Sequence, residues 1–170
     1  MPDFAAPTPL TAEHEVANFD CGKPPLNDFL KEHALARQNA MLSRTYVVTP
    51  VGSLHVAAYY TLAHVSSVRE QAPKKIARGM PDTIPALLLA RLAIDETFQR
   101  QGLGKSLFSD ALRRTWAVMS QAAAPVRFFV VDAKDEEARA YYEKLGMTPS
   151  PTNPMRLFLH YKDLQAIFEA

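Results

Sequence analysis

Residues 89–108 read LARLAIDETFQRQGLGKSLF, and this stretch decides how the rest of the chain is interpreted. Its first part, through Ile94, is an apolar run that is typical of a buried strand. Gly102 and Gly104 follow a short polar turn, and an apolar pattern at helical spacing begins at Leu103. A helix N-terminus exposes unpaired N–H groups, and glycine lets the backbone approach a ligand closely. The stretch therefore predicts an anion-binding loop between a strand and a helix.

Two common phosphate-binding loops do not fit this stretch. A Walker A loop requires G-x-x-x-x-G-K-[ST], but its first glycine would fall at Gln99. A Rossmann fingerprint requires G-x-G-x-x-G, but its third glycine would fall at Leu107. The sequence thus disfavours a nucleoside triphosphate or a dinucleotide as the ligand. A glycine-rich helix start without any ligand stays open at this point.

The rest of the chain predicts an α/β (α+β) fold with a mixed central sheet flanked by helices. Strands are expected over residues 44–50, 53–68 (one long or two short), 86–94, 126–133 and 155–161. Helices are expected over residues 21–41, 103–119 and 135–146. The polar, proline-interrupted segment 69–85 is expected to be a loop with at most a short helix, and residues 1–12 to be loosely ordered.

The helix expected over residues 103–119 has one apolar and one polar face. The apolar face comprises Leu107, Phe108, Ala111, Leu112 and Met119. The polar face comprises Ser109, Asp110, Arg113 and Arg114. This pattern predicts a helix that packs its apolar face on the sheet.

Composition excludes several classes of protein. The 170 residues carry a net charge of +1, so bulk charge argues neither for nor against nucleic-acid binding. The single cysteine, Cys21, excludes an internal disulfide framework, and the five histidines show no metal-ligand spacing, so no metal site is expected. The sequence shows neither a signal peptide nor an apolar run long enough to span a bilayer. These features predict a cytoplasmic protein without a membrane contact.

The stretch resembles the acetyl-CoA loop of the GNAT superfamily of N-acetyltransferases, whose pattern is Q/R-x-x-G-x-G/A. Gln99, Gly102 and Gly104 hold the three defining positions, and ARAYYEKLGM at 138–147 resembles the second signature of the family. The order of expected strands and helices also matches. The resemblance implies one GNAT acetyltransferase domain over residues 1–170, with a splayed cleft between the strands at 86–94 and 126–133.

The resemblance also implies how acetyl-CoA, the acetyl donor, is held. Main-chain groups of the strand before the loop would hold the pantetheine arm and the thioester carbonyl, and these belong to Leu92, Ala93 and Ile94. The loop that would hold the pyrophosphate comprises Gln99, Arg100, Gln101, Gly102, Leu103, Gly104 and Lys105. Asp132 stands where family members often place a polar contact to coenzyme A, although such an aspartate can instead cap the next turn.

The second signature contains two adjacent tyrosines. Ala138, Tyr141 and Leu145 share one helical face, which we expect to pack in the core. Tyr142 lies about 100° further round the helix and directly precedes Glu-Lys, as the general acid of the family does. The resemblance thus implies that Tyr142 is the general acid, since a phenol with a pKa of about 10 can donate a proton to a departing CoA thiolate. A hydrogen-bonded packing tyrosine is the alternative.

Residues 19–48, FDCGKPPLNDFLKEHALARQNAMLSRTYVV, resemble one branch of the family, the GNAT toxins of type II toxin–antitoxin systems. That branch carries F-x-C-G-x-x-x-L-[ND]-x-[FW]-L followed by R-T-Y-V, and the Pro24–Pro25 pair is a small departure from it. The resemblance implies a toxin that acetylates the α-amino group of aminoacyl-tRNA and blocks translation. It also implies a ribbon-helix-helix antitoxin and a homodimer.

Basic side chains provide candidate contacts to tRNA phosphates, although a solvated surface is the alternative for each. They are Arg37, Arg44, Arg69, Lys74, Lys75, Arg78 and Arg91. Two other functions stay open. One is acetylation of a small amine, such as a polyamine or an antibiotic, or of a protein N-terminus. The other is a CoA-binding regulatory module without catalysis. The amino-acid specificity and the cognate antitoxin do not follow from the sequence.

Overall fold

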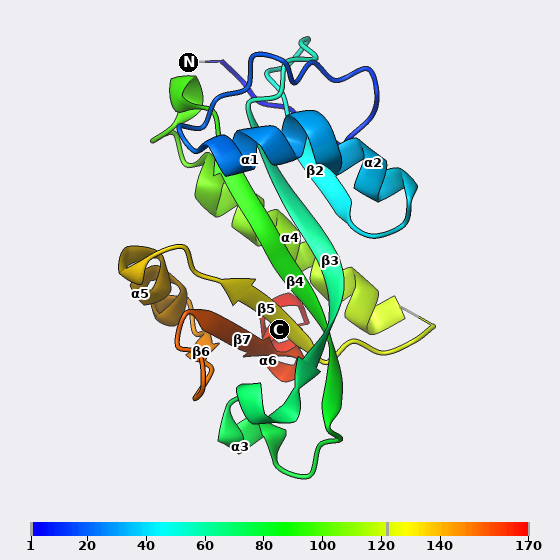
Figure 1. The fold of residues 1–170 in the computed structure, drawn as a ribbon, viewed down its shortest axis with the longest axis vertical. Coiled ribbons are helices and arrows are strands. Elements are labelled where there is room, and N and C mark those ends of the chain that lie inside the picture. The colour runs from blue at the N-terminus through cyan, green and yellow to red at the C-terminus, as the bar shows by residue number, and fades with distance from the viewer. Residues whose placement is uncertain (1, 122, 170) are drawn as a thin grey trace. The chain divides into compact units, whose positions relative to one another are not determined.

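Two long strands and one long helix organise the chain, whose computed structural model describes residues 2–121 and 123–169. β3 (Ala58–Val68), β4 (Thr83–Ile94) and α4 (Leu103–Gln121) each contribute to two compact units (Figure 1). The first unit comprises Met1–Ala63 and Ala90–Ala111, and the second comprises His64–Leu89 and Leu112–Ala170. Each unit is described separately below, and the predicted single domain stays a prediction.

Within the described residues, seven strands pair in the order β1-β2-β3-β4-β5-β7-β6. The other strands are β1 (Thr8–Pro9), β2 (Arg44–Val48), β5 (Phe128–Asp132), β6 (Thr148–Pro149) and β7 (Arg156–His160). β1–β2, β2–β3, β5–β7 and β6–β7 pair antiparallel, whereas β4 and β5 pair in parallel. The sheet is mixed, as the sequence predicts.

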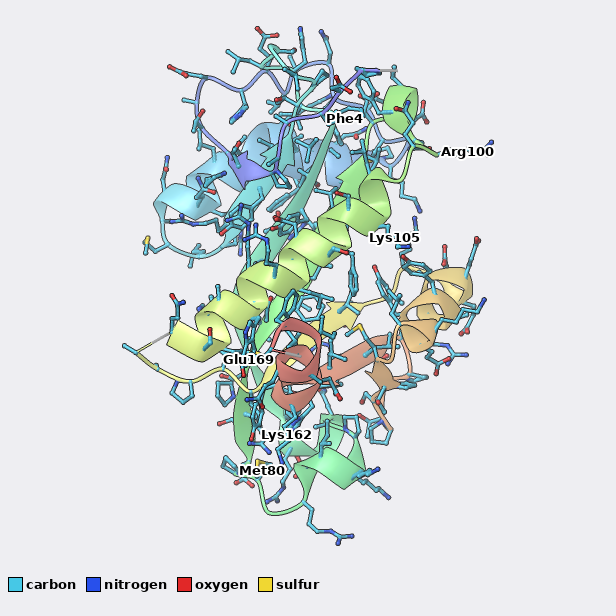
Figure 2. All side chains as sticks on the ribbon, turned by 180° about the vertical axis from the view of Figure 1, so that it is seen from behind. Phe4, Met80, Arg100, Lys105, Lys162 and Glu169 are labelled. Atoms are coloured by element: carbon cyan, nitrogen blue, oxygen red, sulfur yellow. The ribbon has the colours of Figure 1, made fainter. Side chains whose placement is uncertain are left out.

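Alternating side chains of β3 build both faces of the sheet in the first unit. The Tyr59 hydroxyl donates to the main-chain oxygen of Leu26 at 2.7 Å, whereas the Tyr60 hydroxyl donates to the Asp110 carboxylate on α4 at 2.5 Å. Successive strand side chains point to opposite faces, so helices cover both. One face carries α1 (Pro24–Asp28), a π-helical turn (Phe29–His33) and α2 (Ala34–Asn39). Figure 1 shows α1 and α2 in front of β3, and Figure 2, which is the view from the opposite side, shows α4 in front of the strands.

The second unit packs its core around β5 and β7. The buried residues of this core are Ala72, Ala77, Ile84, Ala86, Phe128, Val130 and Phe158. The helices of the unit are α3 (Lys74–Ala77), α5 (Glu136–Lys144) and α6 (Tyr161–Phe168). Parallel pairing joins Ala86–Leu89 to Phe128–Val131, and β4 continues beyond this pairing to Ile94. The predicted splay of the two strands stays a prediction.

Four sequence-based expectations differ from the structure. Residues 8–9 are not loose, because β1 pairs with β2 and the following Leu10 is buried. α6 and β6 were not expected; α6 begins with a capping box between His160 and Asp163, and histidine is not among the usual N-cap residues. β4 begins at Thr83 and includes Pro85 rather than beginning at residue 86.

The polar face predicted for α4 is wrong at Asp110, which is only 9% exposed. Its carboxylate accepts the hydrogen bond from Tyr60, a residue whose side chain is fully buried. A polar side chain at this place is stable because it has partners that replace water. Helical periodicity alone predicts that Asp110 is solvated, because the spacing of residues along a helix carries no information about a partner on β3.

Replacing Tyr60 with Phe should destabilise the fold, because the buried Asp110 carboxylate would lose a donor. We expect the free energy of unfolding, measured by urea denaturation, to fall by about 1–3 kcal/mol. Tyr141→Phe is the matched control, since Tyr141 is exposed, and it should change stability by less than about 0.5 kcal/mol. Equal stability of the two variants would contradict the structural role of this hydrogen bond.

Candidate cofactor loop and catalytic residue

The loop after β4 has the backbone of an anion site. Arg100 and Gly102 both adopt left-handed conformations, with φ angles of 64° and 83°. A Cβ atom on Gly102 would meet no atom within 4 Å, so glycine is required there by the backbone angle rather than by crowding. Such conformations turn successive N–H groups towards one side of a loop, the arrangement that binds anions.

The first turn of α4 adds free amide groups to this loop. The amide of Ser106 donates to the Gly102 carbonyl at 3.1 Å, and this bond opens the helix. The amides of Leu103, Gly104 and Lys105 precede it and have no backbone acceptor among the described residues. Unpaired amides at the positive end of a nineteen-residue helix attract a phosphate.

Gly104 has a different role from Gly102. A Cβ atom there would lie 3.3 Å from Cδ1 of Ile94, so this glycine lets α4 pack closely on the end of β4. Ala93, beside Ile94, is buried in the core of the first unit. The predicted pantetheine segment and the predicted pyrophosphate loop therefore lie against each other.

The side-chain amide of Gln99 fixes the position of the loop through hydrogen bonds. Its Nε2 donates to the carbonyl of Ile94 at 2.9 Å and to the carbonyl of Cys21 at 3.3 Å. Gln99 is thus a positioning residue for the loop. The structure brings it to the segment at residues 19–27, which carries the resemblance to the toxin branch.

Further hydrogen bonds join that segment to the end of β4. Asp95 accepts from the amide of Asp20 at 2.9 Å, and the amide of Glu96 donates to the Asp20 carbonyl at 2.8 Å. The Asp20 side chain accepts from Gly22 and from the Asn27 side chain, and these bonds lower its pKa. Sequence reasoning missed Asp20, Asn27 and Asp95 as members of this network. The asparagine of the branch pattern was the one available signal.

The remaining loop side chains lie in three environments. Arg100 and Lys105 are exposed, and Figure 2 labels them on the loop and at the start of α4. Leu103 is buried. The side-chain oxygen of Gln101 is enclosed and has no hydrogen-bond partner among the described residues. The loop thus combines positive side chains at its surface with an enclosed polar atom.

Tyr142 lies on α5 in the second unit. Asp135 caps the N-terminus of this helix, and its side chain accepts a hydrogen bond from the Ala138 amide at 2.8 Å. Tyr142 is half-buried, and burial raises the pKa of its hydroxyl, with a smaller contribution from Tyr141. It therefore keeps its proton at neutral pH, as a proton donor must. The expectation that Tyr141 and Leu145 pack in the core is wrong, since they are 42% and 41% exposed.

Asp132 already has a partner in the structure. Nε and Nη2 of Arg156 donate to its two carboxylate oxygens at 2.7 and 2.8 Å, across the β5–β7 pairing. The hydrogen bond that Arg156 donates to this carboxylate raises the pKa of Arg156. Such a bidentate pair fixes the ends of the two strands. The predicted contact between Asp132 and coenzyme A stays a prediction.

Three candidate tRNA contacts lie in the first unit. Arg37 and Arg44 are exposed, whereas the guanidinium of Arg91 stacks on the ring of Phe29 at 3.8 Å. Burial lowers the pKa of Arg91, and the nearby charge of Arg37 lowers it further. Of these three residues, Arg91 is therefore the one that is partly withdrawn from solvent.

The other candidates lie in the second unit. Arg69 pairs with Asp82 at 3.2 Å and donates to the Met80 carbonyl at 3.0 Å, so it closes its own loop. Met80 marks this segment in Figure 2. Lys74, Lys75 and Arg78 are exposed and have no ion pair with any other described residue. Their charges are available to a polyanion.

Two features are absent from the described residues. Over residues 2–121 and 123–169, no three histidine, cysteine or acidic side chains gather as a metal site would require. Over the same ranges, no helix has the length and apolar character needed to cross a bilayer.

Residues 43–148 match the family model described as an acetyltransferase (GNAT) domain. The chain belongs to the GNAT acetyltransferase family. It is 36% identical, over 98% of both chains, to a tRNA-acetylating toxin of Mycobacterium tuberculosis. The GNAT fold and the acetyltransferase activity expected from the sequence are thereby confirmed.

Two solved structures of AtaT are similar along nearly the whole chain. AtaT complexed with acetyl-methionyl-tRNAfMet has a TM-score of 0.87 and 30% identity, covering 98% of this chain and 99% of that one. A tyrosine-to-phenylalanine variant of AtaT, bound to the C-terminus of the antitoxin AtaR and to acetyl-CoA, has a TM-score of 0.79 and 29% identity over 99% of both chains. These are relatives of the same branch that the sequence resembles.

Gln99→Glu should loosen the acetyltransferase loop, because a carboxylate cannot donate to the carbonyls of Ile94 and Cys21. We expect the free energy of unfolding to fall by about 1–2 kcal/mol in a urea titration. Gln121→Glu makes the same chemical change at the exposed end of α4 and serves as the control. If the two variants unfold alike, Gln99 does not hold the loop.

Proposed function

We propose that this GNAT enzyme is a toxin that transfers the acetyl group of acetyl-CoA to the α-amino group of aminoacyl-tRNA and thereby blocks translation. The observation that carries the proposal is the likeness, along 98% of the chain, to a tRNA-acetylating toxin. A structural feature supports it: the 19–27 segment, which carries the branch resemblance, is hydrogen-bonded to the loop through Gln99 and Asp95. The proposed reaction takes place in the cytoplasm, where aminoacyl-tRNA is used.

The loop suits the pyrophosphate of acetyl-CoA. The free amides of Leu103, Gly104 and Lys105 and the left-handed Gly102 fit a bound anion. The exposed side chains of Arg100 and Lys105 would add positive charge. Main-chain groups of Leu92, Ala93 and Ile94 would hold the pantetheine arm and the thioester carbonyl.

Tyr142 is the proposed general acid. The neutral amine of the acceptor attacks the acetyl carbonyl carbon, the C–S bond breaks, and the CoA sulfur takes the phenolic proton of Tyr142. The attacking nitrogen loses its extra proton to water. Because burial raises the pKa of Tyr142, its hydroxyl is protonated before each turnover. Tyrosine-to-phenylalanine variants of the relatives AtaT and KacT have been solved, which is in keeping with a special tyrosine in this branch.

The acceptor proposed here does not need a strong base. An α-amino group with a pKa near 8 is neutral in roughly a tenth of molecules at neutral pH, whereas a lysine side chain is neutral in only about 0.04%. Glu96 and Glu143 are the two acidic side chains considered as a base, and Glu143 pairs with Arg139 at 3.2 Å. An α-amine is therefore a better match to this chain than a lysine side chain.

Basic residues of both units would hold the tRNA backbone. Lys74, Lys75 and Arg78 in the second unit, and Arg37, Arg44 and Arg91 in the first, are proposed to contact phosphates. Arg69 is proposed to act indirectly, since it is bound within its own loop. We further propose a ribbon-helix-helix antitoxin as partner, in line with AtaT bound to AtaR, and a homodimer.

Transfer of labelled acetyl groups tests the acceptor. Incubated with labelled acetyl-CoA and charged total tRNA, the enzyme should label the tRNA fraction, and deacylated tRNA should stay unlabelled because it lacks the α-amine. Polyamines and a peptide with a free N-terminus are parallel acceptors in the same assay. Label on these, with none on charged tRNA, would replace the toxin with an acetyltransferase of small amines or protein N-termini.

Tyr142→Phe tests the proton donor. We expect acetyl transfer to charged tRNA to fall by about 10²–10⁴-fold, because a general acid contributes this much. CoA affinity, measured by calorimetry, should stay within about twofold of the parent, since the hydroxyl is assigned no binding role. Tyr141→Phe, which alters the exposed neighbour, should keep full activity. Full activity of Tyr142→Phe would contradict the assignment, and no labelled acceptor at all for the parent enzyme would favour a non-catalytic CoA-binding module.

A further inference from the structure

A cavity of about 380 Å³ lies within the second unit and involves none of the residues assigned above. Its walls come from the second half of α4, the segment that enters β5, and α6. The lining residues are Trp116, Met119, Pro125, Val126, Arg127, Tyr161 and Gln165. Figure 2 labels Lys162 and Glu169, which mark the two ends of α6. The volume is within the usual range for a small-molecule site.

Two aromatic side chains give this cavity flat walls. Trp116 and Tyr161 are both half-buried. The ring of Tyr161 lies 4.5 Å from the ring of His160 and 5.3 Å from the guanidinium of Arg127, so it is held from two directions. Met119 and Val126 complete an apolar lining. Such walls suit a planar ring, because aromatic groups pack well against aromatic and apolar surfaces.

Arg127 supplies the one charged group of the lining. Its Nε is enclosed and has no hydrogen-bond partner among the described residues. The Arg127 guanidinium makes no ion pair with another described residue, so its charge is available to an acidic group that enters the cavity. The acids of α6 and its C-terminal end do not pair with Arg127. The Asp163 carboxylate accepts from the His160 amide, and Glu169 accepts from the Gln165 side chain at 3.2 Å.

We propose that this cavity binds an aromatic carboxylate, with the ring against Trp116 and Tyr161 and the carboxylate on the guanidinium of Arg127. A guanidinium binds carboxylates through paired, charge-assisted hydrogen bonds. The ligand chemistry is shared by a free aromatic acid and by a peptide that ends in phenylalanine. The proposal is independent of the acceptor for the acetyl group.

Tryptophan fluorescence measures occupancy directly, since Trp116 is the only tryptophan of the chain. Phenylacetate, or the tripeptide Gly-Gly-Phe with a free carboxylate, should change this fluorescence to saturation. Phenylacetamide keeps the ring and loses the charge, and acetate keeps the charge and loses the ring, so both should bind at least about tenfold more weakly. Saturation by phenylacetate indicates a free acid as the source, and saturation by the tripeptide alone indicates a peptide.

Arg127→Gln tests the carboxylate contact, with Lys162→Gln as the control, because Lys162 carries a charge on α6 next to Tyr161 but does not line the cavity. The dissociation constant should rise at least about tenfold in the first variant and stay unchanged in the second. If Arg127→Gln does not fold, the comparison of phenylacetate with phenylacetamide on the parent protein decides instead. No saturable change with either probe, or equal binding of phenylacetate and phenylacetamide, would overturn the proposal.

Discussion

The hydrogen bonds of the Gln99 side chain are the constraint on which the donor loop depends. One amide nitrogen holds the end of β4 through Ile94 and the branch segment through Cys21. The loop backbone is left-handed at Gly102, where glycine permits it, and at Arg100, where a non-glycine residue seldom adopts this conformation without support. Because Asp95 and Glu96 bind Asp20 beside this contact, the N-terminal segment and the loop form one hydrogen-bonded structure.

This arrangement joins the loop pattern and the branch pattern of this sequence in one structure. The glycine pattern shapes the loop, and the F-x-C-G pattern supplies main-chain groups that hold it. Gly22 is part of this fit, since a Cβ atom there would lie 2.5 Å from Oε1 of Glu96, and its φ angle is 86°. In the second unit, Tyr142 has a separate constraint: burial on α5 raises its pKa and keeps its proton in place.

Periodicity and short motifs predicted much of the fold and the loop, because these depend on neighbours in the sequence. The starts of α4 after Gly102 and of α5 after Asp135 were predictable in this way, and so were the strands of the central sheet. The partners of Asp110, Gln99 and Asp20 could not be predicted, since Tyr60, Cys21 and Asp95 lie 50, 78 and 75 positions away along the chain. The predicted inward face of α5 is wrong because spacing does not show which side of a helix meets the core. Tyr141 and Leu145 have helical spacing but remain exposed.

The proposed enzyme attaches the acetyl group to the α-nitrogen of the amino acid carried by tRNA. Mass spectrometry of the amino acids released by mild base from the reacted aminoacyl-tRNA measures this directly. We expect N-acetyl-amino acids whose fragments carry the acetyl group on the α-nitrogen. Release of unmodified amino acids, with acetyl groups found instead on the RNA or on lysine side chains, would contradict this expectation.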